Sequence, residues 1–206
     1  KKRYNPKNSK SLMLRFHTQT AGFSLTAQQP ENNISRTSLQ ALAAVLGGTQ
    51  SLHTNSMDET LALPSEKAAE IALRTQQILA YETGVANVVD PLGGSYYIEN
   101  LTDKIEEEAN KYFKKIENIG GVVNGIESGY FQREIADSSS LYNDKIEKKD
   151  RYVVGVNEFV KEDEKIEIPI LEITDKVQTM QIERLKKNRF KRDNKLVNRK
   201  LIKITE

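Results

Sequence analysis

Residues 15–29 read RFHTQTAGFSLTAQQ, and residues 49–59 read TQSLHTNSMDE. Each stretch lies at a short strand-like segment and is dense in amide, hydroxyl and imidazole side chains. A helical pattern follows each polar cluster. The order strand, polar loop, helix, occurring twice in succession, is typical of proteins with a parallel sheet. The sequence therefore predicts an α/β fold that contains two βα units.

The two strands are predicted from short apolar or alternating runs. Residues 11–16 alternate weakly, and residues 49–54 form a second short candidate. In parallel sheets, ligands bind on the loops that follow the carboxyl ends of the strands. His17 and His53, the two histidines of the chain, are therefore expected on those loops.

Two long helices are predicted after the polar loops. Asn32 or Asn33 is expected to cap the first helix, and Gly47 is expected to end it. The second helix is expected to start after Pro64 and to end near Thr83. The apolar positions at helical spacing in the first helix are Ile34, Leu39, Leu42, Val45 and Leu46, and the buried stripe expected for the second helix is Ala68, Ile71, Ala72, Thr75, Ile78 and Leu79.

The rest of the chain predicts a mostly helical extension. Helices are expected over residues 101–119, 122–143 and 177–197, and a short strand over residues 152–159. The expected domain organisation has three parts: residues 1–100 for the two βα units, 101–160 for the helical extension with its short strand, and 161–206 for a linker and a basic helix.

Composition excludes several classes of protein. The chain has 206 residues, a net charge of +2 and no cysteine, so it gives no whole-chain argument for nucleic acid and holds no thiolate metal site. No apolar run approaches the roughly 20 residues of a membrane span. The basic start KKRYNPKNSK lacks the apolar segment of a signal peptide. Because the first residue is Lys rather than Met, we expect a piece of a longer protein.

Positive charge is concentrated at the C-terminal end. Residues 181–206 contain ten Lys or Arg against three acidic residues, and Phe190 is their one aromatic residue. The charges are spaced around a helix that has an apolar side. This pattern favours an amphipathic helix that docks on protein over a segment that binds nucleic acid.

The common catalytic motifs are absent. The sequence has no GxGxxG, no P-loop, no HExxH and no GxSxG, and no spacing favours a nucleophilic triad. A metal site at the two histidines with Asp58 and Glu59 is an alternative, but the spacing favours loop residues that cap helices, so we predict no metal site. Two loops rich in neutral hydrogen-bonding groups favour a large, polar, mostly uncharged ligand.

Several blocks carry a resemblance to a known family. They are RFHTQTAGFSLTAQQPENNISRT (15–37), TQSLHTNSMDETLALPSEKAAEIALRTQQIL (49–79) and VDPLGGSYYIE (89–99), followed by YVVGVNEF (152–159) and QIERLKKNRFKRD (181–193). In this order and with these separations, the blocks resemble the methylmalonyl-CoA mutase family of coenzyme-B12-dependent acyl-CoA mutases. The resemblance covers nearly the whole chain.

The resemblance implies a fold and a set of partners. The chain would hold the last two βα units of a TIM (β/α)8 barrel, followed by the helical C-terminal extension. The earlier strands and the cobalamin-binding domain, with its Asp-x-His-x-x-Gly motif, are expected outside this sequence. The expected partners are an acyl-CoA substrate, the rest of the barrel, a cobalamin-binding domain or subunit, and further copies in an oligomer. We expect no nucleic acid, no membrane and a cytoplasmic location.

The resemblance also implies residue roles in the reaction cavity. His17 and Gln19 would line the cavity near the adenosyl group and the substrate, and Gln50, expected on the second strand, would face the same cavity. Phe23 stands where many relatives have Trp, which keeps an apolar wall.

Four more residues would contact the cofactor, adenosylcobalamin. Gly22 would lie where the backbone approaches the corrin ring. Glu59 and Ala62 align with cobalamin-contacting positions, and Asn55 and Glu59 would reach the ribose of the adenosyl group.

The implied activity is the radical isomerisation of methylmalonyl-CoA and succinyl-CoA, in which the cofactor carries the difficult chemistry. The isolated chain is expected to be inactive. Two alternatives stay open. The chain would belong to a sibling mutase that acts on isobutyryl-CoA, 2-hydroxyisobutyryl-CoA or ethylmalonyl-CoA, or it would be a non-catalytic assembly module for a B12 subunit.

Overall fold

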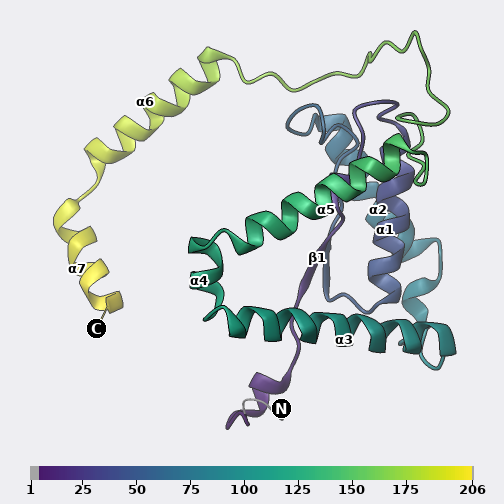
Figure 1. The fold of residues 1–206 in the computed structure, drawn as a ribbon. Helices are drawn as coiled ribbons and strands as arrows, with labels where there is room; N and C mark the ends of the chain where they lie inside the picture. The colour runs from purple at the N-terminus through teal and green to yellow at the C-terminus, as the bar shows by residue number, and fades with distance from the viewer. Residues whose placement is uncertain (1–4, 206) are drawn as a thin grey trace. The chain divides into compact units, whose positions relative to one another are not determined.

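The computed structural model describes residues 5–205. The chain divides into a first unit that ends at Pro169 and a second that begins at Ile170. Figure 1 shows the elements in chain order. In the first unit these are the 3-10 turns η1 (Ser9–Leu12), η2 (Gly22–Ser24) and η3 (Val85–Asn87), the strands β1 (His17–Gln19) and β2 (Ser51–His53), and the helices α1 (Asn32–Leu46), α2 (Glu66–Tyr81), α3 (Tyr96–Asn118), α4 (Val122–Glu127) and α5 (Tyr130–Glu147).

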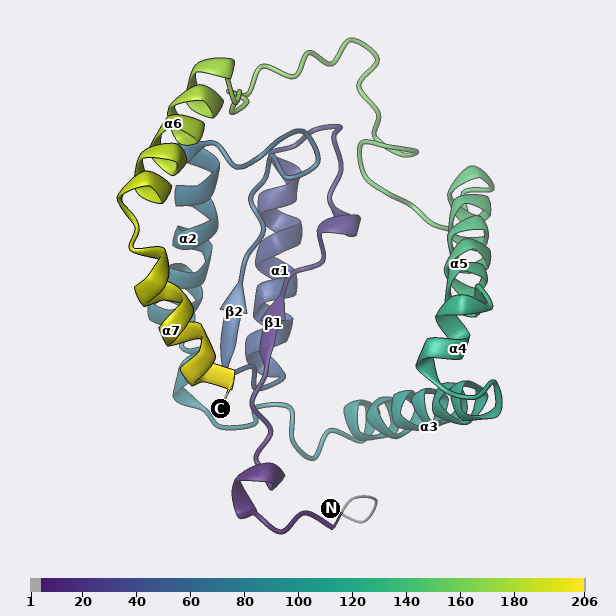
Figure 2. The same cartoon turned by 90° about the vertical axis from the view of Figure 1, so that its left-hand side faces the viewer.

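Strands β1 and β2 form a two-stranded parallel sheet. They lie side by side and point the same way, and helices α1 and α2 run alongside them (Figure 2). Each strand is followed in the chain by a polar loop and then by one of these helices. The predicted α/β fold with two consecutive βα units is confirmed. Closure into a barrel needs more strands than the described residues contain, so the barrel stays a prediction.

The predicted helices agree closely with α1 and α2 at their ends. Gly47 ends α1, and its N–H donates to the carbonyl oxygen of Ala43. Ser65 caps α2, because its Oγ accepts from the N–H of Ala68 at 3.2 Å. The expected cap of α1 is wrong, since Asn32 and Asn33 lie inside the helix.

The buried face of α1 also differs from the expectation. Its buried residues are Asn33, Thr37 and Ala41, which are small or polar and spaced four apart, whereas Leu39 is 69% exposed. The face is polar because α1 lies against the loop after β1 and hydrogen-bonds to it.

The first predicted strand is wrong in position. Residues 11–16 contain the end of η1, which Asn8 caps by accepting from the N–H of Lys10 at 2.9 Å. The strand itself begins at His17, where pairing with Ser51 sets the register. A weak alternation does not make a strand without a neighbour to bond with.

Glycines decide how the helical extension is divided. Helix α3 ends before Gly120 and Gly121, both at positive φ. The single helix predicted over residues 122–143 is two helices, α4 and α5, because Gly129 adopts a left-handed conformation between them. Figure 1 shows α4 at the corner between α3 and α5.

The strand predicted over residues 152–159 is wrong. The segment forms a turn in which the N–H of Gly155 donates to the carbonyl oxygen of Glu158 at 2.8 Å, with an isolated bridge between Val154 and Glu158. Gly155 has a φ of +82°, which interrupts an extended run.

The second unit consists of α6 (Asp175–Lys191) and α7 (Asn194–Thr205). One helix was predicted over residues 177–197, and the structure breaks it at Arg192. The side chain of Asp193 accepts hydrogen bonds from the N–H groups of Lys195 and Leu196, which caps α7 as a new helix.

The apolar core of the described residues is small. Its buried apolar side chains are Leu25, Ala41, Ala68 and Leu79. Large apolar side chains are exposed on every helix of both units, Leu39 and Ile78 among them. Within residues 5–205, no helix is both long and apolar enough to cross a bilayer.

Candidate functional site

The sheet presents four polar side chains on one face. Its register pairs His17 with Ser51 and Gln19 with His53, and all four are exposed. Directly paired residues on neighbouring strands point to the same side of a sheet, and residues two apart on one strand do the same. Thr18 and Leu52 lie on the other face and are half-buried.

His17 and Gln50 lie at the amino ends of the strands, which was expected for Gln50 but not for His17. His17 is the first residue of β1 rather than part of the following loop. Gln50 precedes β2, and its Oε1 accepts from the N–H of Phe16 at 2.9 Å. Together with Arg15 and Ser51, these residues line a shallow, open depression of the surface.

The loop after β1 is held by the first turns of α1. Asn33, fully buried, accepts from the N–H of Thr26 at 3.0 Å and donates through Nδ2 to the carbonyl oxygens of Thr26 at 2.8 Å and Met57 at 2.9 Å. Gln40 accepts from the N–H of Ala21 at 2.6 Å. One buried amide therefore joins the polar loops of both βα units.

The loop after β2 is buried although it is polar. Asn55, Ser56 and Asp58 are at most 4% exposed. The N–H of Asn55 donates to Thr20 Oγ1 at 2.9 Å, and Asp58 Oδ2 accepts from the N–H of Ser65 at 2.8 Å. These bonds tie the loop to β1 on one side and to the start of α2 on the other.

Gly22, Asn55 and Glu59 form a cradle, a name we keep for these three residues. A Cβ at Gly22 would lie 2.7 Å from Glu59 Oε1 and 2.9 Å from Asn55 Nδ2, so a side chain there would displace the ends of both side chains. Gln19 Nε2 donates to Asn55 Oδ1 at 3.2 Å. Asn55 Nδ2 is buried and has no hydrogen-bond partner within the described part of the chain.

The structure brings four of the seven predicted site residues together. Gln19 contacts the cradle through Asn55, and the cradle holds the other three. Ala62 lies in the turn that follows Glu59, where its N–H donates to the carbonyl oxygen of Asp58 at 3.1 Å. The predicted site therefore runs along the strands instead of forming one cluster.

Two residues of this face were not predicted as part of it. His53 was considered only as a loop residue or metal ligand, and Ser51 was not singled out. Their alternation with Leu52 was the available signal, but its meaning depends on the strand's register. His53 also lines a cavity of about 240 Å³ with Ser56, Glu59 and Gln76.

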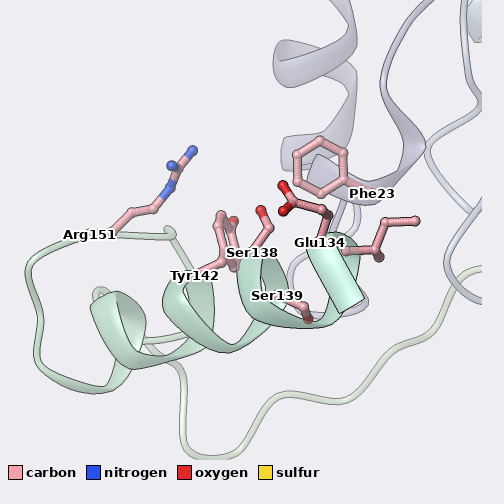
Figure 3. Close-up of a pocket in the computed structure, with 7 residues that line it drawn as sticks. Phe23, Glu134, Ser138, Ser139, Tyr142 and Arg151 are labelled. Atoms are coloured by element: carbon pink, nitrogen blue, oxygen red, sulfur yellow. The ribbon is translucent and has the colours of Figure 1, made fainter. Parts of the chain in front are cut away.

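A further cavity of about 480 Å³ lies between the loop after β1 and α5. Figure 3 shows Glu134 and Ser138 projecting from α5 toward Phe23. Phe23 is 79% exposed and meets the ring of Tyr142 edge-on, with the ring centroids 6.2 Å apart. The guanidinium of Arg151 lies 4.7 Å from the centroid of the Tyr142 ring.

The segment 151–164 anchors the loop after β1 from the far end of the first unit. Arg36 donates to Thr26 Oγ1 and to the carbonyl oxygen of Val154, both at 2.8 Å. Gln29 donates through Nε2 to the carbonyl oxygen of Phe159 at 2.9 Å, and its N–H donates to Glu164 at 2.6 Å. The loop that carries Gly22 is thus bonded to residues more than one hundred positions later in the chain.

The site consists mainly of neutral hydrogen-bonding side chains. Within residues 5–205, no group of three or more His, Asp or Glu side chains is arranged to hold a metal ion. The face consists of imidazole, hydroxyl and amide groups, with Glu59 as the carboxylate of the cradle. Such groups position a polar ligand through neutral hydrogen bonds.

Comparison with known proteins gives consistent matches. The family model for methylmalonyl-CoA mutase matches residues 1–206. The chain is 47% identical over 195 residues to the large subunit of 2-hydroxyisobutanoyl-CoA mutase from Aquincola tertiaricarbonis, covering 94% of this chain and 34% of that protein. It is 44% identical over 199 residues to methylmalonyl-CoA mutase from Rhizobium meliloti, covering 96% of this chain and 28% of that protein.

The human mitochondrial methylmalonyl-CoA mutase is 44% identical over 206 residues, covering all of this chain and 27% of the human protein. The chain therefore spans about a quarter to a third of the length of these relatives. The match extends over every element described above, from the two βα units to the basic helices. This chain belongs to the methylmalonyl-CoA mutase family.

Proposed function

We propose that this chain supplies one side of the active site of an adenosylcobalamin-dependent acyl-CoA mutase. The observation that carries the proposal is the cradle, which joins the loops after two consecutive parallel strands of a chain from this family. A ligand-facing edge built from such loops is the usual place for a site in a parallel sheet.

The residues present fit the cofactor. Gly22 has no side chain, so the polar ends of Glu59 and Asn55 can lie close to its backbone and present a carboxylate and an amide together to a ligand. Asn55 Nδ2 is a buried donor without a partner in residues 5–205. Because buried donors are normally hydrogen-bonded, an acceptor atom of a bound ligand would stabilise this group. Glu59 is exposed, so its carboxylate is free to accept from the hydroxyl groups of a ribose.

When bound, adenosylcobalamin would supply the radical chemistry that rearranges the acyl group. The residues of this chain would bind and orient. Asn55 and Glu59 would hold the adenosyl ribose, and Gly22 and Ala62 would lie against the corrin. Gln19, fixed by Asn55, would face the reacting groups together with His17 and Gln50. No strong acid–base pair is needed, because the reaction requires no full proton transfer.

The small core supports the proposal that the chain acts within a larger assembly. The four buried apolar side chains of the described residues give little stabilisation, and the exposed ones need partners to cover them. We propose that the chain completes a TIM barrel with further strands and meets a cobalamin-binding domain or subunit within an oligomer. The proposed parts are residues 1–100 for the barrel, 101–160 for the extension and 161–206 for the linker and basic helix. The isolated chain would be inactive.

The proposed substrates are methylmalonyl-CoA and succinyl-CoA. A second candidate, 2-hydroxyisobutyryl-CoA, is favoured by the relative that is 47% identical. We propose a cytoplasmic location, although several relatives are mitochondrial by name. Assay of the assembled mutase with each acyl-CoA separates the two substrates.

The experiment replaces Glu59 with Gln in the assembled mutase. We expect turnover to fall about 100-fold while the KM for acyl-CoA changes little, because a misplaced ribose displaces the reacting carbon. Glu66→Gln is the matched control, since Glu66 is an exposed carboxylate at the start of α2. Unchanged turnover in the Glu59→Gln enzyme would contradict the ribose role.

The second variant, Gly22→Ala, tests the approach of the corrin. Its methyl group would crowd Asn55 and Glu59. We expect the Kd for adenosylcobalamin, measured by its absorbance change on binding, to rise at least tenfold while acyl-CoA binding is retained. Equal cofactor affinity in the two proteins would show that the cradle does not face the corrin.

A further inference from the structure

We propose that Ser51 is a positioning residue that holds His17 as the tautomer protonated on Nε2, so that His17 presents an N–H donor to an oxygen of the acyl group. This inference rests on the proposed function, in which His17 faces the reaction cavity. It assigns a role to Ser51 and a direction to the hydrogen bond of His17.

The register places the two residues directly opposite each other. His17 and Ser51 are paired positions on β1 and β2, and their side chains point to the same face of the sheet. His17 Nδ1 lies 2.7 Å from Ser51 Oγ. Both side chains are exposed on the face that also holds Gln19 and His53.

The length of the bond is compatible with the hydroxyl group as its donor. Hydrogen bonds donated by N–H groups to oxygen cluster near 2.9–3.0 Å, and those donated by hydroxyl groups are about 0.2 Å shorter. At 2.7 Å either group can donate, and we assign Ser51 Oγ as the donor and Nδ1 as the acceptor. In a neutral imidazole, the proton then lies on Nε2.

Ser51 is fixed by its neighbours on the sheet. Thr49 Oγ1 donates to the carbonyl oxygen of Ser51 at 2.9 Å, and the hydroxyl groups of Thr49 and Thr18 lie 2.6 Å apart. The backbone that carries Ser51 is thus bonded to β1 through two threonines. A hydroxyl on so constrained a backbone can fix both the ring angle and the tautomer of its partner.

The consequence for chemistry is a neutral donor. An Nε2–H can donate to a carbonyl or carboxylate oxygen of the acyl group and hold it in place without transferring a proton. The opposite tautomer would present a lone pair to that oxygen and repel it. Substrate orientation then depends on a hydroxyl that itself does not touch the substrate.

The first measurement needs no variant. This chain has two histidines, so labelling it with 15N-histidine and assembling it with the unlabelled remainder of the mutase gives few ring signals to assign. We expect the 15N shifts of His17 to show a protonated Nε2 and an unprotonated Nδ1. A ring protonated on Nδ1 would overturn the inference, and this result is independent of activity.

The second measurement compares Ser51→Ala with Ser51→Thr. We expect kcat to fall about five- to tenfold in the Ala enzyme, with a mixed tautomer at His17, and both to be restored in the Thr enzyme, which keeps the hydroxyl. Ser140→Ala, on the exposed side of α5, is the control. Wild-type kcat and tautomer in the Ala enzyme would refute the positioning role. Unchanged turnover in Glu59→Gln, together with the expected tautomer of His17, would contradict the proposed ribose role and leave the assignment of Ser51 standing.

Discussion

Replacing Asn33 with Ala should loosen both loops of the candidate site at once. Asn33 is 0% exposed and lies in α1, away from the sheet face that would meet a ligand. Its amide bonds the backbone of Thr26 in the first loop and of Met57 in the second. The variant therefore tests whether one buried side chain couples the two loops.

The magnitude follows from the groups left behind. Truncation removes the partner of the Thr26 N–H and of the Thr26 and Met57 carbonyl oxygens. Each buried polar group left without a partner costs about 1–3 kcal/mol. Water entering the space and movement of Arg36, which also bonds Asn33, recover part of this. We therefore expect opening of the loops to become easier by about 3 kcal/mol.

Hydrogen exchange followed by mass spectrometry measures this opening directly. A loss of about 3 kcal/mol corresponds to exchange faster by roughly 150-fold in peptides that span residues 20–30 and 54–63. Asn33→Asp keeps the acceptor for the Thr26 N–H and the bond from Arg36, but it places an oxygen against the carbonyl oxygens of Thr26 and Met57, so its exchange should also be faster than that of the wild type in both loops.

Ser35→Ala, an exposed position on the same helix, is the matched control and should leave exchange unchanged. Faster exchange in residues 20–30 with no change in residues 54–63 would refute the coupling. Wild-type exchange in both loops would refute the energetic argument altogether.

Two further predictions concern the extension. Gly155→Ala should make residues 151–164 more sensitive to limited proteolysis, by a destabilisation of about 1–2 kcal/mol, because its Cβ would lie 3.1 Å from Gln29 and its φ is +82°; equal cleavage of both proteins would contradict this. The pKa of Tyr112 is raised above its ordinary 10.0, mainly by the hydrogen bond that its hydroxyl donates to Glu134 at 3.0 Å. The contact between α3 and α5 should therefore be intact below pH 10.0 and be lost as the pH rises through the raised pKa of Tyr112. In an absorbance titration, the wild type should show a tyrosine that ionises at this raised pKa, and Tyr112→Phe should lack that transition. Identical titration curves for the two proteins would disprove the contact.

Much of the fold could be predicted from local patterns. The helices of the two βα units were expected at nearly the residues where they lie, because Pro64 and Gly47 are local signals for a helix start and a helix end. The resemblance of the polar loops to a mutase family was also readable, since those blocks are contiguous in the chain. The family match over residues 1–206 confirms it.

The sequence misled at the first strand because the deciding partner was distant, and elsewhere because local end signals were missed. Residues 11–16 alternate like a strand, yet pairing begins at His17, because Ser51 and not the local pattern sets the register. Gly129, Gly155 and Asp193 each end an element that hydrophobic periodicity would continue.

The sequence by itself determined the two βα units, their polar loops and the family. The tertiary structure alone decided that Ser51 and His53 share a face with His17 and Gln19, and that Gly22 lies against Asn55 and Glu59. The reason is physical. A helix end depends on hydrogen bonds within four residues, whereas register and loop contact depend on bonds across more than thirty residues, which no local pattern encodes.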